Sequence, residues 1–161
     1  MTPFDATAYE ERVRAGCFVC AFLTGEPGYE HELLYDDGDH VAFLSRYPTL
    51  PGYALVVPRR HVTDVIRDLS PSEYLGLQAV VHRVARALNA VVPTERTYVL
   101  SLGSMQGNSH IHWHVAPLPP GVPYSRQQYH ALMHENGVLS QSTAEIAALG
   151  AAIRAALSDL E

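Results

Sequence analysis

The longest periodic pattern in the chain predicts a helix over residues 72–91. Ser70, Pro71 and Glu73 stand at its start and fit a helix N-cap, a first-turn proline and the acid of a capping box. Apolar residues then recur at steps of three and four, which places them on one face of a helix, and Pro93 ends the pattern. This apolar stripe consists of Tyr74, Leu77, Val81, Val84, Leu88 and Val91.

Two further segments carry helical periodicity. Residues 1–16 show a weak pattern, whereas a clearer stripe near the C-terminus predicts an amphipathic helix capped by Ser142. The apolar positions of that second helix are Ile146, Leu149, Ile153, Leu157 and Leu160.

Five short runs with the composition of β-strands lie between these helices. Gly38-Asp39 fits a hairpin turn after the first run, and a proline-bounded loop at 47–52 follows the second. Short links of this kind favour antiparallel pairing. The runs are residues 31–37, 40–46, 53–58, 96–102 and 110–117. The order of elements predicts a single α+β domain over residues 1–161, with an antiparallel sheet of about five strands, a long helix and a C-terminal helix.

Composition narrows the class of protein. Hydrophobic residues make up 47% of the 161 residues and charged residues 17%, which is typical of a globular domain. The net charge of −6 argues against broad nucleic-acid binding, which needs a basic face. We see neither a signal peptide nor an apolar run long enough to cross a bilayer, so we expect a cytoplasmic protein with no membrane partner.

The segment "HIHWHV" carries the clearest candidate chemistry. On a strand, alternate side chains point to one face, so His110, His112 and His114 are expected to share a face. The opposite face then packs large apolar groups, which are Ile111, Trp113 and Val115.

Three interpretations of these histidines remain. They can be a solvated face, a zinc site, or a nucleophile with its helpers. One straight strand spreads three imidazoles too far apart to reach one zinc ion, which weakens the second interpretation. A neutral imidazole is a good nucleophile at pH 7 and can take up a phosphoryl or nucleotidyl group. The preceding Gly-rich loop at 103–109 offers backbone N–H groups and polar side chains for phosphate.

Three sequence blocks resemble the histidine triad (HIT) superfamily. "HIHWHVAP" matches its His-φ-His-φ-His-φ-φ signature, where φ is apolar, and "FLSRYPTLPGYALVVPRRH" at 43–61 is similar to its second block. "CFVC" is similar to the C-x-x-C of many bacterial members, so the resemblance runs from about Cys17 to Pro120. It implies a fold with an antiparallel sheet, a homodimer, and a hydrolase or transferase of nucleotide phosphates. In such enzymes the middle histidine attacks the α-phosphorus, which makes His112 the nucleophile and assigns His114 to the phosphates or leaving group.

The resemblance also implies a nucleotide site. Ser45 occupies the usual ribose position, although many relatives have an acid or an amide there. Phe43 and Leu44 fall close to the usual base pocket. The phosphate segment contains Ser101, Gln106, Asn108 and Ser109. In contrast to many relatives, Ser109 directly precedes the triad, and "APLPPGVPY" follows it in place of Pro-Arg. Arg46, Arg59 and Arg60 are alternatives to the basic residue that is missing after the triad, or are merely solvated.

A zinc site is the second implication of the resemblance. Relatives with the C-x-x-C commonly bind zinc through residues that correspond to Cys17, Cys20, His61 and His110. Mixed Cys/His sets suit structural zinc, and we expect such an ion to clamp the N-terminus onto the sheet. The alternatives are two buried free cysteines or a redox pair.

Two hypotheses for function follow. The first is a HIT-type enzyme that uses His112, with a purine nucleotide or a dinucleoside polyphosphate as substrate. The second is a catalytically weak nucleotide-binding or interaction module with a structural zinc. The polar stretch 123–137 fits either a cover over the site or a surface helix. Histidines outside the motifs, which are His40, His82, His130 and His134, are expected at the surface or in hydrogen bonds.

Overall fold

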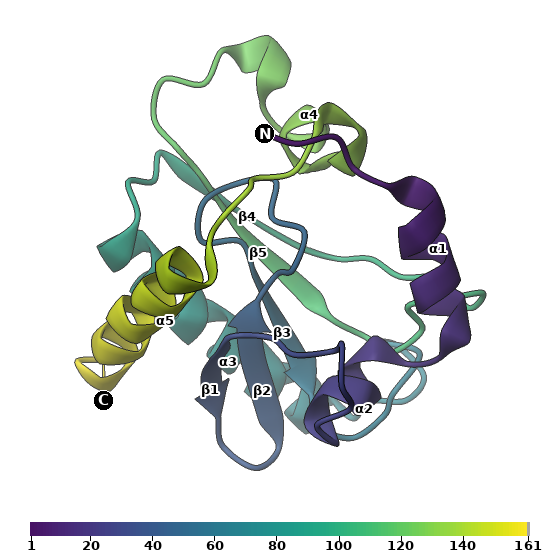
Figure 1. Ribbon diagram of the computed structural model, residues 1–161. Coiled ribbons are helices and arrows are strands. Elements are labelled where there is room, and N and C mark those ends of the chain that lie inside the picture. The colour runs from purple at the N-terminus through teal and green to yellow at the C-terminus, as the bar shows by residue number, and fades with distance from the viewer. Residues whose placement is uncertain (161) are drawn as a thin grey trace.

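The computed structural model describes residues 1–160, which form a five-stranded antiparallel sheet in the order β1-β2-β3-β5-β4 (Figure 1). The strands are β1 (Leu33–Asp36), β2 (His40–Leu44), β3 (Ala54–Pro58), β4 (Arg96–Ser101) and β5 (Trp113–Leu118). The predicted α+β fold, with its long helix and C-terminal helix, is confirmed. That residues 1–161 form one domain stays a prediction, and Glu161 lies outside the described residues.

Helices cover the two faces of the sheet unequally (Figure 1). The α-helices are α1 (Ala6–Ala15), α2 (Phe18–Leu23), α3 (Pro71–Val91), α4 (Tyr129–Leu132) and α5 (Thr143–Ser158), and η1 (Tyr124–Arg126) and η2 (His134–Asn136) are short 3-10 turns. Helices α3 and α5 bury the larger core on one face. Helix α2 and part of the 122–132 segment close the other face. Within residues 1–160 we find no helix with the length and apolarity needed to span a membrane.

Both long helices begin at the predicted caps. The Ser70 Oγ accepts a hydrogen bond from the Glu73 N–H, and the Glu73 carboxylate accepts one from the Ser70 N–H. Ser142 and Glu145 make the same reciprocal pair at the start of α5. These boxes satisfy backbone donors that the first turn of a helix leaves unpaired.

The histidine strand is shorter than the sequence pattern predicts, because β5 begins at Trp113 rather than at residue 110. Its partner β3 ends at Pro58, and the Ile111 N–H then bonds to the Val62 carbonyl, 2.8 Å away, in the loop that follows β3. The alternation nevertheless continues through the segment. Ile111, Trp113 and Val115 all lie in the core beneath α3, as predicted.

Candidate active site and metal centre

Four predicted metal ligands converge beside α2. The ligand atoms of Cys17, Cys20, His61 and His110 all lie within 4.8 Å of one another. Cys20 Sγ is 3.3 Å from His61 Nδ1, and Cys17 Sγ is 3.5 Å from His110 Nδ1. A tetrahedral zinc ion with bonds of about 2.0–2.3 Å needs its ligand atoms at separations of this size. The four residues therefore fit a structural zinc ion.

Cys17 and His110 are each held by a further hydrogen bond. The Cys17 side chain caps α2 and accepts from the Cys20 N–H, with 3.4 Å between sulfur and nitrogen. His110 Nε2 lies 2.8 Å from the Pro58 carbonyl oxygen, which can only accept, so Nε2 carries the proton. The Nδ1 lone pair of His110 is then left for a metal. Metal-bound histidines commonly donate their other N–H in this way.

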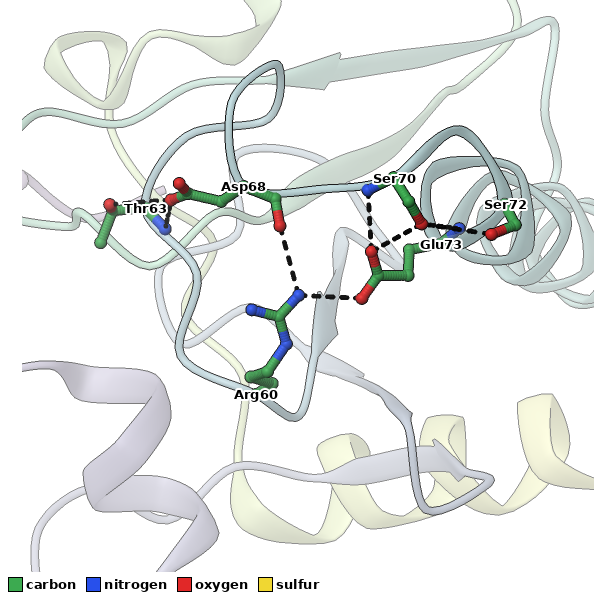
Figure 2. Close-up of polar contacts among 6 residues, drawn as sticks. All are labelled: Arg60, Thr63, Asp68, Ser70, Ser72 and Glu73. Carbon is green, nitrogen blue, oxygen red and sulfur yellow. Dashed lines mark hydrogen bonds and ion pairs between the residues drawn. The ribbon is translucent and has the colours of Figure 1, made fainter.

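The loop that carries His61 is braced against the start of α3 (Figure 2). The Arg60 guanidinium donates to the Asp68 carbonyl at 3.2 Å and to the Glu73 carboxylate at 2.9 Å. The Asp68 carboxylate in turn accepts from the Thr63 N–H at 3.2 Å. Because Glu73 also closes the capping box, the N-cap of α3 and the metal-ligand loop share one polar network.

A cavity next to the metal cluster contains the other two triad histidines. His112 and His114 line it from the sheet, Phe18 from α2, and Tyr9 from α1. The rings of His112 and His114 are 4.8 Å apart between centroids. The triad thus divides between two sites, with His110 in the metal cluster and its two neighbours in the cavity.

The tautomer of His112 follows from its one carbonyl partner. Its Nδ1 is 2.7 Å from the His110 carbonyl oxygen, so Nδ1 carries the proton and Nε2 keeps a lone pair. Burial lowers the pKa of His112, whose side chain packs edge-on against Phe18. The ring is therefore a neutral imidazole at pH 7, which is the nucleophilic form.

His114 has a different set of neighbours. Its Nδ1 lies 3.0 Å from the Tyr53 hydroxyl, and its Nε2 is buried without a hydrogen-bond partner among the described residues. Burial, with smaller contributions from His112 and His134, lowers the pKa of His114 to about 3. The imidazoles of His112 and His114 are thus both neutral at physiological pH.

Two of the seven predicted nucleotide-binding residues line the cavity. These are Ser45 and Asn108. The Asn108 backbone has a φ of 52°, and its Oδ1 is buried without a partner among the described residues. Asn108 Nδ2 donates to the Tyr9 hydroxyl, which ties the loop 103–109 to α1.

The remaining five lie outside the cavity lining. Phe43 is buried beneath it, against Phe18, whereas Leu44 points into the core under α3. The Ser101 hydroxyl donates to the His112 carbonyl oxygen at 2.9 Å and, like Ser109, lines a neighbouring hollow. Gln106 is exposed and lines neither space. The nucleotide roles of all seven residues stay predictions.

Positive charge gathers at one rim of the cavity. Arg12 and Arg46 both line it, and each guanidinium donates to the Gly28 carbonyl oxygen at 2.5 Å. The other two arginines considered above are engaged elsewhere, since Arg59 pairs with Asp36 and Arg60 with Glu73. In a chain with a net charge of −6, this local pair of cations suits an anionic ligand.

Several cavity residues are not evident from the sequence motifs. His134, expected at the surface or in a hydrogen bond, lines the cavity and stacks on Phe4 with 4.6 Å between ring centroids. The end of the 123–137 stretch therefore reaches the cavity, while Tyr124 and Tyr129 in the same stretch are exposed. Tyr9 gives no sequence signal either. Tyr53 does give a sequence signal, because it alternates with the buried β3 residues that face the cavity.

Comparisons with known proteins agree with these features. The HIT domain profile matches residues 26–120. An uncharacterized HIT-like protein of Mycobacterium tuberculosis is 32% identical over 105 residues, which cover 63% of this chain and 70% of that protein. An AP-4-A phosphorylase of the same species is 36% identical over 80 residues, or 47% of this chain and 40% of the phosphorylase.

A solved structure agrees in fold. The crystal structure of a Zn-bound histidine triad family protein from Mycobacterium smegmatis superposes with a TM-score of 0.67. Its sequence is 24% identical, and the match covers 91% of this chain and 96% of that one. With the profile match spanning more than half of its length and the triad in place, the chain belongs to the HIT domain family.

Proposed function

We propose that this protein is a nucleotide phosphate hydrolase or nucleotidyltransferase that works through a covalent nucleotidyl-His112 intermediate. The observation that carries the proposal is the tautomer of His112. Its Nδ1–H is committed to the His110 carbonyl oxygen, so a lone pair on Nε2 remains at a ring that lines the cavity. A nucleophile fixed in its reactive form needs no proton transfer before attack.

The reaction divides into two displacements. His112 Nε2 attacks the α-phosphorus, the new N–P bond forms, and the bond from phosphorus to the leaving-group oxygen breaks. The ring becomes a cation that still donates Nδ1–H to the carbonyl oxygen, which stabilises it. Water or a phosphate oxygen then attacks the same phosphorus, the N–P bond breaks, and His112 returns to its neutral form.

Dinucleoside polyphosphates and related AMP conjugates are the proposed substrates. Arg12 and Arg46 supply positive charge at the rim for several phosphates. The Tyr9 hydroxyl can both donate and accept a hydrogen bond. The Asn108 side-chain amide can therefore rotate by half a turn, accept from Tyr9 through Oδ1, and offer its Nδ2–H groups to a phosphate. The similarity to an AP-4-A phosphorylase, though limited to part of that protein, agrees with this class.

Zinc is the proposed cofactor of the cluster formed by Cys17, Cys20, His61 and His110. Two sulfurs and two imidazole nitrogens at these separations match a closed tetrahedral site, which leaves no open position for chemistry. When bound, zinc supplies a cross-link between α2, the loop after β3 and the segment that precedes β5. The chemistry itself is done by protein residues. A zinc ion that holds His110 also fixes the His110 carbonyl oxygen, and this oxygen orients the His112 ring.

A homodimer across β4 and α3 is proposed as the assembled form. Strand β4 stands at one end of the sheet and exposes Val99, at 46% of its surface. Leu102, which directly follows β4, and Leu75 of α3 are also exposed, at 59% and 65%. An unprotected sheet edge with apolar side chains is a surface that proteins normally cover.

Intact-mass spectrometry on the full chain tests the enzyme proposal. The protein is mixed with diadenosine tetraphosphate and quenched without acid, because phosphoramidates are acid-labile. We expect a fraction of the protein to gain the mass of one adenylyl group, which is AMP less one water, and His112→Ala to gain none while it retains its zinc. His82→Ala, which removes an exposed histidine of α3, is the matched control and should label like the wild type.

The rival function gives a different result. A nucleotide-binding module would bind the dinucleotide, yet it would neither form the adduct nor release product over hours, and His112→Ala would change affinity alone. That outcome, together with no turnover of AMP phosphoramidates, would overturn the proposed chemistry.

A further inference from the structure

Tyr53 lies in a rigid position against His114. It is 5% exposed, and its ring stands nearly perpendicular to the imidazole, with an interplanar angle of 88° and 5.8 Å between centroids. Its backbone is fixed on both sides, since its N–H donates to Leu50 and its carbonyl accepts from Ser45. The hydroxyl oxygen is 3.0 Å from His114 Nδ1. Tyr53 therefore contacts one nitrogen of a cavity imidazole and leaves the other untouched.

The direction of this hydrogen bond follows from counting polar hydrogens. A neutral imidazole carries one N–H, and a phenol carries one O–H. If Nδ1–H donated to the phenol oxygen, the Tyr53 O–H would have no acceptor, and His114 Nε2 would be a second polar group without a hydrogen-bond partner. If the Tyr53 O–H donates to Nδ1, only the Nε2–H of His114 lacks a partner. Buried polar groups without partners are costly, so the second arrangement is favoured.

The charge states of both groups agree with this count. Burial raises the pKa of Tyr53, so the phenol stays protonated at physiological pH. Burial is also the main reason that the pKa of His114 is low, so its imidazole stays neutral. One group that must donate thus faces one nitrogen that is free to accept.

We propose that Tyr53 is a positioning residue that holds His114 in its Nε2–H tautomer, so that His114 presents a hydrogen-bond donor to a phosphate oxygen. The neighbouring His112 is held in the opposite tautomer by the His110 carbonyl. Two imidazoles whose centroids are 4.8 Å apart then offer complementary groups: a lone pair on His112 for phosphorus and an N–H on His114 for oxygen. The identity of the acceptor as a phosphate oxygen rests on the proposed function. The tautomer itself does not.

The unpartnered Nε2 supports a ligand role for this donor. Most buried polar atoms in proteins have a hydrogen-bond partner. His114 Nε2 has none among the described residues, so we expect water or a ligand to supply one. His114 lines the same cavity as the nucleophile. A donor that is already oriented stabilises charge that develops on oxygen in the transition state without reorganising.

Nitrogen-15 NMR of the histidine rings tests the proposal without a substrate. Long-range proton–nitrogen correlations distinguish the two neutral tautomers, and His114→Ala assigns the ring by loss of its signals. In the wild type we expect His114 to show a protonated Nε2 and an unprotonated Nδ1. Tyr53→Phe keeps the ring and removes the hydroxyl, and should convert His114 to a mixture with Nδ1–H. His112 serves as an internal reference and should keep Nδ1–H in every variant.

A matched variant separates this effect from a general change in the cavity. Tyr47 lines the same cavity but contacts Phe4, Tyr9 and His134 instead of His114, so Tyr47→Phe should leave the tautomer of His114 unchanged. An Nδ1–H tautomer of His114 in the wild type, or a pattern that Tyr53→Phe leaves unaltered, would overturn the proposal.

Kinetics extend the test to the reaction. For an active wild type, Tyr53→Phe should lower kcat for nucleotidyl transfer by a few-fold, in proportion to the Nε2–H form of His114 that is lost, with little change in KM, because this donor acts mainly in the transition state. An unchanged kcat alongside an altered tautomer would remove the phosphate-donor role. A wild type without activity but with the expected tautomers would refute the proposed function and leave the positioning role of Tyr53 intact.

Discussion

Two neighbouring sites use the same residue type in opposite ways. In the metal cluster, His110 has both ring nitrogens engaged, one with the Pro58 carbonyl and one facing the cysteine sulfurs. In the cavity, His112 and His114 each have one nitrogen held by the protein and one without a hydrogen bond to any residue that the structure describes. Only one residue, Ile111, separates His110 from His112, so the difference does not come from distance along the chain.

The contrast shows what distinguishes a structural imidazole from a functional one. A histidine with its nitrogens satisfied within the protein adds stability and fixes geometry. A buried nitrogen left without a partner costs stability and is retained where a ligand completes it. Sequence spacing alone cannot separate the two, because the triad repeats one residue type at equal intervals. Three substitutions test the structural side of the contrast, from the largest expected effect to the smallest.

His61→Ala should have the largest effect, because it removes a ligand of the metal cluster. Zinc content should fall from one ion per chain to nearly none, and the free energy of unfolding should drop by more than about 3 kcal/mol, since structural zinc contributes about 10–16 kcal/mol in small metal-folded domains. Metal analysis and thermal denaturation measure these quantities. His82→Ala on α3 is the control and should change neither. A stable, metal-free His61→Ala variant would show that the cluster does not support the fold.

Arg60→Ala should have an intermediate effect, because Arg60 braces the His61 loop rather than binding metal. Loss of its bonds to Asp68 and Glu73 should lower zinc affinity about ten-fold, in the range seen for groups that orient metal ligands. Competition with a chelator of known affinity gives the value. Arg67→Ala is the matched control, since its side chain is 85% exposed. Equal zinc affinity in both variants would disconnect the network of Figure 2 from the metal site.

Ser70→Ala should have the smallest effect of the three. It removes the N-cap of α3 and should lower the free energy of unfolding by about 1 kcal/mol, as measured by urea denaturation. Ser72→Ala removes only the 3.1 Å hydrogen bond between the Ser72 and Ser70 hydroxyls, leaves the cap itself in place, and should cost less than about 0.5 kcal/mol. Equal stability of the two variants would show that the Ser70 cap contributes no more to the free energy of unfolding than Ser72 does.

The sequence predicted those parts of the molecule that depend on local periodicity. The stripe from Tyr74 to Val91 predicted α3, while the capping box at Ser70 and the N-cap at Ser142 predicted where α3 and α5 begin. The convergence of Cys17, Cys20, His61 and His110 was also predicted, because the resemblance to the HIT superfamily assigned these four positions to one site. Strand ends were less well predicted, since β5 starts only where β3 can pair with it.

The walls of the cavity were harder to predict, because they combine segments far apart in the chain. Tyr9, Tyr53 and His134 meet there only after folding, and no periodic pattern relates them. The expectations for Phe43 and Leu44 show another limit. Adjacent strand residues point to opposite faces, so the two side chains cannot line the same cavity wall, and Leu44 is in the core under α3.

Helix α1 forms one wall of the cavity and is held to the protein without buried residues of its own. It covers the cavity with Tyr9, Arg12 and Val13. Its side-chain hydrogen bonds to the rest of the described chain include a surface bond from Arg12 to Gly28 and a half-buried bond from Asn108 to Tyr9. A segment held this weakly opens for a small part of the global unfolding free energy, and such openings occur in microseconds to milliseconds. If the proposed reaction takes place, departure of product is the step that opening of this helix would control.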